Sequence, residues 1–190
     1  CEPDLKLPGA FVLDAREAAL LDALGEGNAG CQVPAGAPRV IHAFGSAMRL
    51  SPTHATGEWD CSNAFGCMDR PTALWETWRH IPSLAKFMLS NFGQPTPLWI
   101  QQADGSWWVT LVWGGAFQGL TSAGVAFCIV MAKVRRDTLG GFSPLEVRFV
   151  SVVFYYDDVI SKCPLWLLVK LGLLLRQALA AVGLSLNVQK

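Results

Sequence analysis

Two adjacent carboxylates, Asp157 and Asp158, directly follow an apolar and aromatic run at residues 147–156. Neighbouring negative charges repel each other, and placing them beside an apolar strand costs free energy unless a cation or proton compensates. Hard oxygen ligands of this kind suit a divalent metal ion. Aspartate also favours turns over strand interiors, so the pair taken alone is more typical of a polar hairpin turn at the surface.

A third carboxylate and a glycine-bearing loop favour the metal interpretation. Asp60 lies in a predicted short strand at residues 58–61. If this strand lies next to the strand that leads to Asp157, the three acids converge into a site for two metal ions, as in enzymes of phosphoryl transfer. The loop at 114–119 presents Gln118 beside Gly119, where a substrate can approach the backbone and bond to the amide. A tight connection into the following helix is the alternative interpretation of this loop.

The composition indicates one globular domain with a real core. The chain has 190 residues, of which 52% are hydrophobic and 16% charged, and this excludes a disordered protein. A net charge of zero gives no electrostatic argument for nucleic acid, although a basic groove on one face is compatible with it. The apolar run at 164–184 is long enough for a bilayer, but Lys170 and Arg176 interrupt it. We therefore expect a core helix there and no membrane contact.

The cysteines and histidines predict neither a zinc site nor a disulfide framework. The six cysteines contain no Cys-x-x-Cys pair, and the three histidines lack zinc-finger spacing to them. We expect buried free thiols in a reducing compartment and structural histidines. The absence of an initiator methionine and of obvious terminal structure predicts a piece of a longer protein.

Periodicity and capping residues predict a mixture of helices and strands without strict alternation, which is an α+β fold. A hairpin is expected around Asp104-Gly105, and Asp69 with Pro71 should open a helix that Pro82 breaks. Asp14 and Thr121 or Ser122 are the expected N-caps of two other helices. Helices are expected at 14–24, 40–50, 69–92, 121–136 and 165–182, strands at 58–61, 98–102, 107–113 and 148–155, and a loop and a turn at 25–38 and 52–57.

Four segments, in this order, resemble the catalytic motifs of a reverse transcriptase. They are Asp60-x-x-Asn63-Ala64-Phe65; Gly115-x-x-Gln118-Gly119 with Phe127 downstream; Phe154-Tyr155-Tyr156-Asp157-Asp158-Val159; and Val182-Gly183-Leu184-Ser185-Leu186-Asn187-x-x-Lys190. Upstream, residues 30–37 and His42-Ala43 resemble the fingers segment of non-long-terminal-repeat retrotransposons, nearest to the site-specific elements of trypanosomatid genomes. The resemblance covers roughly residues 25–190.

The resemblance implies the fingers-palm portion of a right-hand polymerase, with an antiparallel palm sheet packed on helices. Residues 1–57 would be a partial fingers segment, and 58–190 the palm, with fingers or connecting elements at about 70–112. A thumb and flanking domains would be absent. The implied activity is RNA-directed DNA polymerisation, in which a primer 3′-hydroxyl attacks a deoxynucleoside triphosphate on an RNA template. We expect an intracellular, nuclear location within a larger retroelement protein, and the sequence leaves the oligomeric state open.

The resemblance also assigns roles to individual residues. Asp60, Asp157 and Asp158 would form the acidic cluster for two Mg²⁺ ions, which Mn²⁺ could replace. Phe65 matches the steric gate that excludes a 2′-hydroxyl, and Lys190 would sit near the pyrophosphate leaving group, with a solvated surface lysine as the equal alternative. The other expected contacts with nucleotide, template or primer are Cys61, Ser62, Asn63, Ala64, Gln118, Gly119, Tyr155 and Tyr156.

Two departures from the family pattern leave a second hypothesis open. The second motif continues as Leu120-Thr121 where relatives carry an acidic or polar residue and Pro-Leu-Ser-Pro, and Gly66 follows Phe65 where many relatives carry Asp or Asn. Neither change removes a metal ligand, but the first affects the substrate loop. The alternative is a catalytically inactive remnant that binds RNA or another protein.

Overall fold

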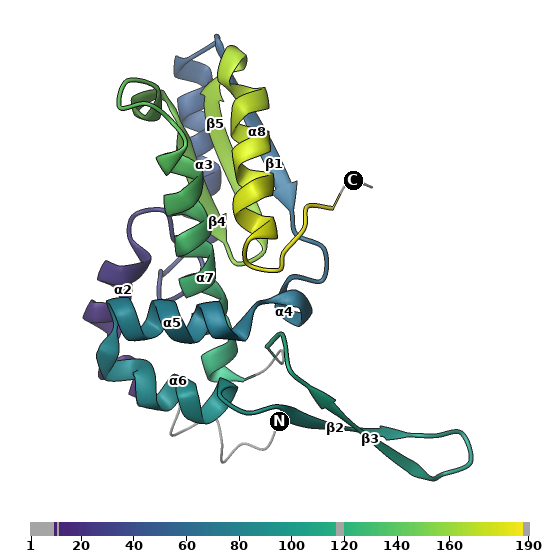
Figure 1. Cartoon of the computed structure of the whole chain (residues 1–190). Coiled ribbons are helices and arrows are strands. Elements are labelled where there is room, and N and C mark those ends of the chain that lie inside the picture. Colours follow the sequence, from purple (N-terminus) through teal and green to yellow (C-terminus); the bar gives the residue numbers. More distant parts are fainter. Residues whose placement is uncertain (1–9, 11, 117–119, 188–190) are drawn as a thin grey trace.

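A three-stranded antiparallel sheet forms the centre of the computed structural model, which describes the chain except for residues 1–9, 11, 117–119 and 188–190 (Figure 1). The strand order is β1-β5-β4, with β1 at His54–Asp60, β4 at Ser151–Tyr155 and β5 at Asp158–Pro164. β4 and β5 are the two arms of a tight hairpin, and β5 pairs with β1 on its other side.

Alternation along the strands gives the sheet one buried face. Trp59, Val159 and Phe154 are register partners across the three strands and point to the same side. Helices α7 (Thr121–Gly140) and α8 (Leu165–Ala180) pack against the sheet, α7 along β4 and α8 along β1 and β5 (Figure 1). The buried hydroxyl of Ser161 on this face accepts a hydrogen bond of 2.9 Å from the Trp59 indole nitrogen.

The opposite face of the sheet is only partly covered. Helix α3 (Gly36–Leu50) contacts β1 and β4, and Lys162 donates a 2.7 Å hydrogen bond to the Ala47 carbonyl oxygen. Lys162 lies four positions along β5 from Asp158. The end of the sheet that carries Asp60 and Asp158 is therefore the less covered end.

Helix α8 forms because its leucines recur once per turn on the inner side. Leu167, Leu171 and Leu175 are four residues apart and fully buried, whereas the outer residues are exposed. Pro164 closes β5 and immediately precedes the helix, where its fixed φ and missing amide cost little. The predicted helix at 165–182 is confirmed except that it ends at Ala180.

A second group of helices lies beside the end of α7 (Figure 1). Helix α5 (Arg70–His80) starts at Asp69, whose carboxylate accepts a 2.9 Å hydrogen bond from the Thr72 amide, as the sequence predicted. The chain then passes through a short 3₁₀ segment at Pro82–Leu84 into α6 (Ala85–Phe92). The buried carboxylate of Glu76 pairs with Arg136, which fastens α5 to α7.

The remaining elements are the β2–β3 hairpin, the N-terminal helix α2 and two short helical turns. Strands β2 (Thr96–Gln101) and β3 (Trp107–Val112) form the predicted hairpin, which protrudes from the body (Figure 1). Near the N-terminus, α2 (Glu17–Leu24) leads into an extended segment that continues the sheet beyond β4. There the Ala29 amide donates to the Phe154 carbonyl at 2.8 Å, and the Phe154 amide donates to Gly27 at 2.8 Å. Four-residue α4 (Ala64–Cys67) and a 3₁₀ turn at Glu146–Phe149 complete the described elements.

The structure confirms a mixed fold of helices and antiparallel sheet but corrects several boundaries. β1 begins at His54, where a turn was predicted. β4 starts only at Ser151, and β5 was not predicted as a strand. Helix α3 begins at Gly36 rather than at residue 40.

The predicted N-caps of α2 and α7 are also wrong. The caps are Arg16 and Leu120, and neither donates or accepts a side-chain capping bond. Helix α7 continues to Gly140, so the basic residues expected at its C-terminus lie inside it. Among the described helices, none is both long and apolar enough to cross a bilayer. The five described cysteines are free thiols, as predicted, and Cys31, Cys61, Cys128 and Cys163 are buried, but Cys67 is exposed, contrary to the prediction of buried thiols.

Candidate active site

Asp60 and Asp158 face each other at one end of the sheet. They are direct partners in the antiparallel pairing of β1 with β5, and they lie on the face opposite Trp59 and Val159. Opposed residues in such a pair have Cβ atoms about 4.5–5.5 Å apart, and like charges there are destabilising. The structure thus brings together two of the acids that were 98 positions apart in the sequence.

Asp157 occupies the turn between β4 and β5, one residue before Asp158. The pKa of Cys61, the buried residue that follows Asp60, reflects the proximity of Asp157 to the other two acids. Burial raises the pKa of Cys61 to about 12, and the negative charges of Asp157, Asp60 and Asp158 add to the shift. All three carboxylates therefore lie close enough to the Cys61 thiol to affect its pKa.

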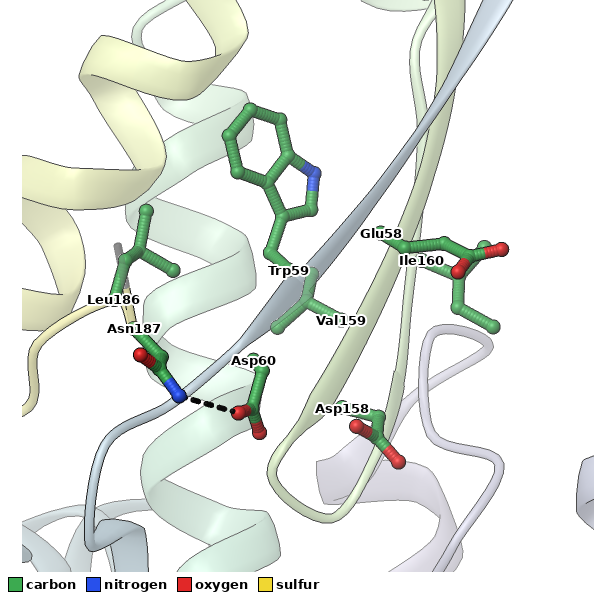
Figure 2. A pocket seen from close by; sticks show the side chains of 8 residues that line it. All are labelled: Glu58, Trp59, Asp60, Asp158, Val159, Ile160, Leu186 and Asn187. Atoms are coloured by element: carbon green, nitrogen blue, oxygen red, sulfur yellow. Dashed lines mark hydrogen bonds between the residues drawn. The ribbon is translucent and has the colours of Figure 1, made fainter. Parts of the chain in front are cut away.

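Residues 185–187 form hydrogen bonds with the end of β1 and with the residues that follow it. The Asn187 amide nitrogen donates to the Asp60 carbonyl at 2.8 Å, and its side chain Nδ2 donates to Asp60 Oδ2 at 3.1 Å (Figure 2). An isolated antiparallel β-bridge joins Cys61 to Leu186, and the Ser62 backbone amide donates to the Ser185 carbonyl at 2.9 Å. These bonds fix both the backbone and the carboxylate of Asp60.

A cleft of about 690 Å³ opens beside these acids (Figure 2). Its walls come from β1, from β5 and from the segment around Asn187. The lining residues are Glu58, Trp59, Asp60, Asp158, Val159, Ile160, Leu186 and Asn187. Three of the eight are acidic, so the cleft favours a cation, or a ligand that carries one.

Phe65 and Tyr156 connect the acids to the core. The Phe65 ring stacks on Phe127 of α7 at 4.6 Å between centroids and lies 6.4 Å from the Tyr156 ring. Phe65 is half-buried, so part of its surface is exposed near the turn. Burial raises the pKa of Tyr156 to about 12.

Tyr156 itself is held in an uncommon backbone conformation. Its φ is +53°, which is unusual for a residue with a bulky side chain. A Cβ atom added to Gly30 would lie 3.0 Å from the Tyr156 ring, and one added to Gly124 would lie 3.4 Å from it. The ring is therefore enclosed by the segment beside β4 and by the first turn of α7. We infer that this enclosure maintains the strained turn that carries Asp157.

The start of the glycine-bearing loop is fastened to the segment that follows Asp60. The Ala116 amide donates to the Phe65 carbonyl at 2.6 Å, and the Gly115 amide donates to Met68 at 2.8 Å. Gly115 has a φ of +69°, and a Cβ atom there would lie 2.4 Å from the Gly66 carbonyl oxygen. Only glycine fits this position, because any side chain would collide with backbone.

A buried arginine, Arg70, reinforces this connection. Its Nε donates to the Gly115 carbonyl at 2.7 Å, and its Nη1 donates to the Gln94 carbonyl at 3.1 Å and to Thr96 at 3.3 Å. The guanidinium also lies 5.9 Å from the centre of the Phe92 ring. Arg70 is only 3% exposed, and burial lowers its pKa from the usual value. It therefore joins the glycine loop, α6 and the base of the hairpin.

The other predicted substrate contacts within the described residues lie just before Phe65 in the chain or at the β4–β5 hairpin. Asn63 adopts the left-handed conformation and precedes α4, whose first residue Ala64 is buried; the first amides of a helix lack intrahelical acceptors. The Ser62 amide, by contrast, already donates to Ser185. Tyr155 is exposed on the same face as Asp158. The predicted residues Gln118, Gly119 and Lys190 lie outside the described residues.

The acids suit a divalent ion in their chemistry. Carboxylate oxygens are the preferred ligands of Mg²⁺, which typically takes one or two carboxylates and completes its shell with water and substrate phosphates. Asp60 and Asp158, directly opposed, could supply such a pair. Among the described side chains, no group of three or more histidines, cysteines or acids is arranged to hold a metal ion.

Two contributors to the site were not found from the sequence. The hydrogen bond from Asn187 to Asp60 was missed, although its motif was noted, because the sequence does not say which residue a motif faces. Arg70 was missed altogether, since a single arginine at a helix start is ordinarily a surface residue. One signal of a special role was that Arg70 lies between the N-cap Asp69 and Pro71, two residues that together fix the direction of the first helical turn.

This arrangement of an antiparallel sheet and surrounding helices is similar to part of the fold of solved telomerase structures. The chain superimposes on apo telomerase from Candida tropicalis truncated from its C-terminal domain, with a TM-score of 0.68 and 10% identity over 95% of this chain and 39% of that one. Telomerase from Candida albicans in complex with the TWJ fragment of telomeric RNA gives a TM-score of 0.67 and 10% identity over 99% of this chain and 34% of that one. The fold is similar to that of telomerase, which agrees with the expected reverse-transcriptase-like architecture.

These comparisons concern the fold. The chain spans less than two fifths of the length of each of these telomerase chains. No protein-family model and no curated protein matches the sequence.

Proposed function

We propose that this chain is the fingers-palm portion of an RNA-directed DNA polymerase from a non-long-terminal-repeat retroelement. It would add deoxynucleotides to a DNA primer 3′-hydroxyl on an RNA template. The observation that carries the proposal is the opposition of Asp60 and Asp158, with Asp157 adjoining, within a telomerase-like fold. Within a larger retroelement protein, this activity would be exercised in the nucleus.

The three acids would hold the divalent ions that this chemistry needs. We assign Asp60, Asp157 and Asp158 to two Mg²⁺ ions, which Mn²⁺ could replace. When bound, such ions lower the pKa of the attacking hydroxyl and neutralise charge on the phosphates. Asn187 supports this role, because its side-chain Nδ2 donates to Asp60 Oδ2 and so helps to fix the orientation of this carboxylate.

The aromatic residues would position the nucleotide and the primer. Phe65 has its ring braced by Phe127, so it is rigid enough to act as a steric gate against a 2′-hydroxyl. Tyr155 is exposed beside Asp158, where it could contact the primer end. Gln118 and Gly119 would contact the nucleotide or template, and Lys190 would stabilise charge on the pyrophosphate.

Primer extension on an RNA template with Mg²⁺ tests the proposal. We expect Asp158→Asn to reduce nucleotide incorporation by at least about a hundredfold, because it removes a ligand charge where phosphate charge develops. Glu58→Gln is the matched control: it lines the same cleft on the same face, two residues from Asp60. Equal loss in both variants, or unchanged incorporation by Asp158→Asn, would refute the assignment of the acids.

The alternative is a remnant that binds RNA or protein without polymerising. One observation favours it: the backbone amide of Ser62, a residue expected to contact nucleotide, template or primer, donates to the Ser185 carbonyl instead. The Leu120-Thr121 departure in the second motif points the same way. RNA binding that survives both Asp60→Asn and Asp158→Asn, together with no incorporation by the unmodified protein, would establish the remnant.

A further inference from the structure

The β2–β3 hairpin carries a continuous apolar face that no described element covers. Strand alternation and the pairing register place Trp99, Trp107, Val109 and Leu111 on one side, and we extend this alternation to Trp113, the first residue after the strand, which is also exposed. We call these five residues the tryptophan face. The hairpin projects away from the body, so the face is accessible (Figure 1).

The exposed apolar area is at the upper end of what a typical monomer presents. The three tryptophans are 63%, 59% and 70% exposed, and Val109 and Leu111 are 40% and 53% exposed. Since a tryptophan can bury roughly 150–250 Å², the face presents on the order of 550 Å² of apolar surface. The largest apolar patch on a typical monomer is about 300–600 Å² and often functional. A two-stranded hairpin is also marginally stable alone, so a covering partner would stabilise it.

The charge distribution identifies the kind of partner. Asp104, at the hairpin tip, is the only charged residue between Lys86 and Lys133. Aromatic platforms that bind single-stranded nucleic acid lie in positively charged grooves, because the phosphates need cations. The uncharged tryptophan face therefore favours an apolar protein surface over RNA or DNA.

The order of side chains along β3 makes the face complementary to itself. Its outward residues run Trp107, Val109, Leu111, Trp113, with a large ring at each end and smaller aliphatic groups between. A two-fold axis would place Trp107 on the partner's Trp113 and Val109 on the partner's Leu111. Such an interface uses the same patch on both subunits, which is the commonest symmetry of protein dimers.

We propose that the tryptophan face is a dimerisation surface on which a second copy of this chain docks by two-fold symmetry. About 550 Å² per copy is below the roughly 800 Å² per partner of a standard stable interface, so the dimer is weak and concentration-dependent. A hollow of about 360 Å³ lined by Trp99 and Trp107 offers room for a partner side chain. The surface is separate from the acidic cleft, and its proposed role does not depend on polymerase activity.

Sedimentation equilibrium of the full chain, from about 1 to 100 µM, tests this proposal. We expect a reversible monomer–dimer equilibrium, and Trp107→Lys should weaken it at least tenfold. Trp108→Lys is the matched control, because Trp108 is equally exposed, at 61% against 59%, but lies on the other side of the hairpin. Circular dichroism melting confirms that each variant is folded.

A mixing experiment tests the register. Leu111→Lys and Val109→Glu should each be monomeric at concentrations where the unmodified chain dimerises, and an equimolar mixture should associate again by facing lysine with glutamate. A mixture that stays monomeric would overturn the two-fold arrangement. An unmodified chain that is monomeric at about 100 µM, or equal weakening by Trp107→Lys and Trp108→Lys, would overturn the dimer and leave the face to a different protein.

Discussion

Replacing Arg70 by methionine should loosen the connection between the glycine loop and the segment after Asp60. Methionine fills similar space but removes all three donated hydrogen bonds. The carbonyls of Gly115 and Gln94 then lose a charged donor in surroundings where Arg70 itself is 3% exposed. Leaving a buried polar group unsatisfied costs about 1–3 kcal/mol.

The two carbonyls together imply a loss of roughly 2–6 kcal/mol, which burial of the methionine and relief of guanidinium desolvation offset in part. We expect a net loss of about 2–4 kcal/mol in the free energy of unfolding. Arg70→Lys should fall between the two proteins, since lysine keeps the charge but lacks the fork that reaches Gly115 and Gln94 at once.

Urea unfolding followed by tryptophan fluorescence measures the global effect. Arg79→Met is the control, because Arg79 is on the same helix but exposed, and its loss should change stability by less than about 0.5 kcal/mol. Hydrogen exchange supplies the local measurement: the amides of Gly115 and Ala116 should exchange faster in Arg70→Met. If Arg70→Met and Arg79→Met unfold at the same urea concentration, with equal exchange at these amides, Arg70 does not hold the loop.

Three further predictions concern ions and pH. If Asp60 and Asp158 bind Mg²⁺ with a dissociation constant near 1 mM, about 10 mM Mg²⁺ should stabilise the fold by roughly 1.4 kcal/mol, and thermal unfolding of Asp158→Asn should show no such gain. Because the pKa of Cys61 rises from 9.0 to about 12 on folding, the folded state holds the thiol proton more tightly. The stability gained in this way is complete below pH 9 and is lost as the pH rises toward 12. An unfolding titration that is flat over this range, or that is unchanged in Cys61→Ala, would contradict this prediction. Hydrogen bonds from Lys170 and, to a lesser degree, from Ser143 lower the pKa of Glu146 from 4.5 to about 2. The stabilising contribution of Glu146 is therefore present above pH 4.5 and lost as the pH falls toward 2. NMR titration of Glu146 with and without Lys170→Met checks this.

The sequence predicted the parts of the fold that depend on neighbouring residues. Asp69 with Pro71 opens α5, and Asp104-Gly105 turns the hairpin, because cap and turn chemistry acts within a few positions. β5 was missed for an equally local reason. Its inward residues after Val159 are Ser161 and Cys163, which are not apolar enough to mark alternation, and Ser161 is acceptable inside only because Trp59 donates to it.

The sequence placed Asp60 and Asp158 in one candidate site, but it did not show how the two residues meet. Asp60 and Asp158 could be expected together only from motif order, since their pairing depends on a strand that the sequence did not indicate. The caps of α2 and α7 were wrong because burial of Leu20 and of Ala126 decides where those helices lie, and packing outweighs capping. The partners of Arg70 could not be assigned from the sequence, since they are 24, 26 and 45 positions away.

The bond from Asn187 to Asp60 joins residues 127 positions apart. Contacts of such long sequence separation have a high loop-closure cost, so they form late in folding, after local helices and the β4–β5 hairpin. A nascent chain could therefore complete its sheet while Asp60 still lacks its support. Fixing the Asp60 carboxylate would then be a separate, final folding step, and a chain shortened before residue 185 would lack the hydrogen bonds that hold this carboxylate and its backbone.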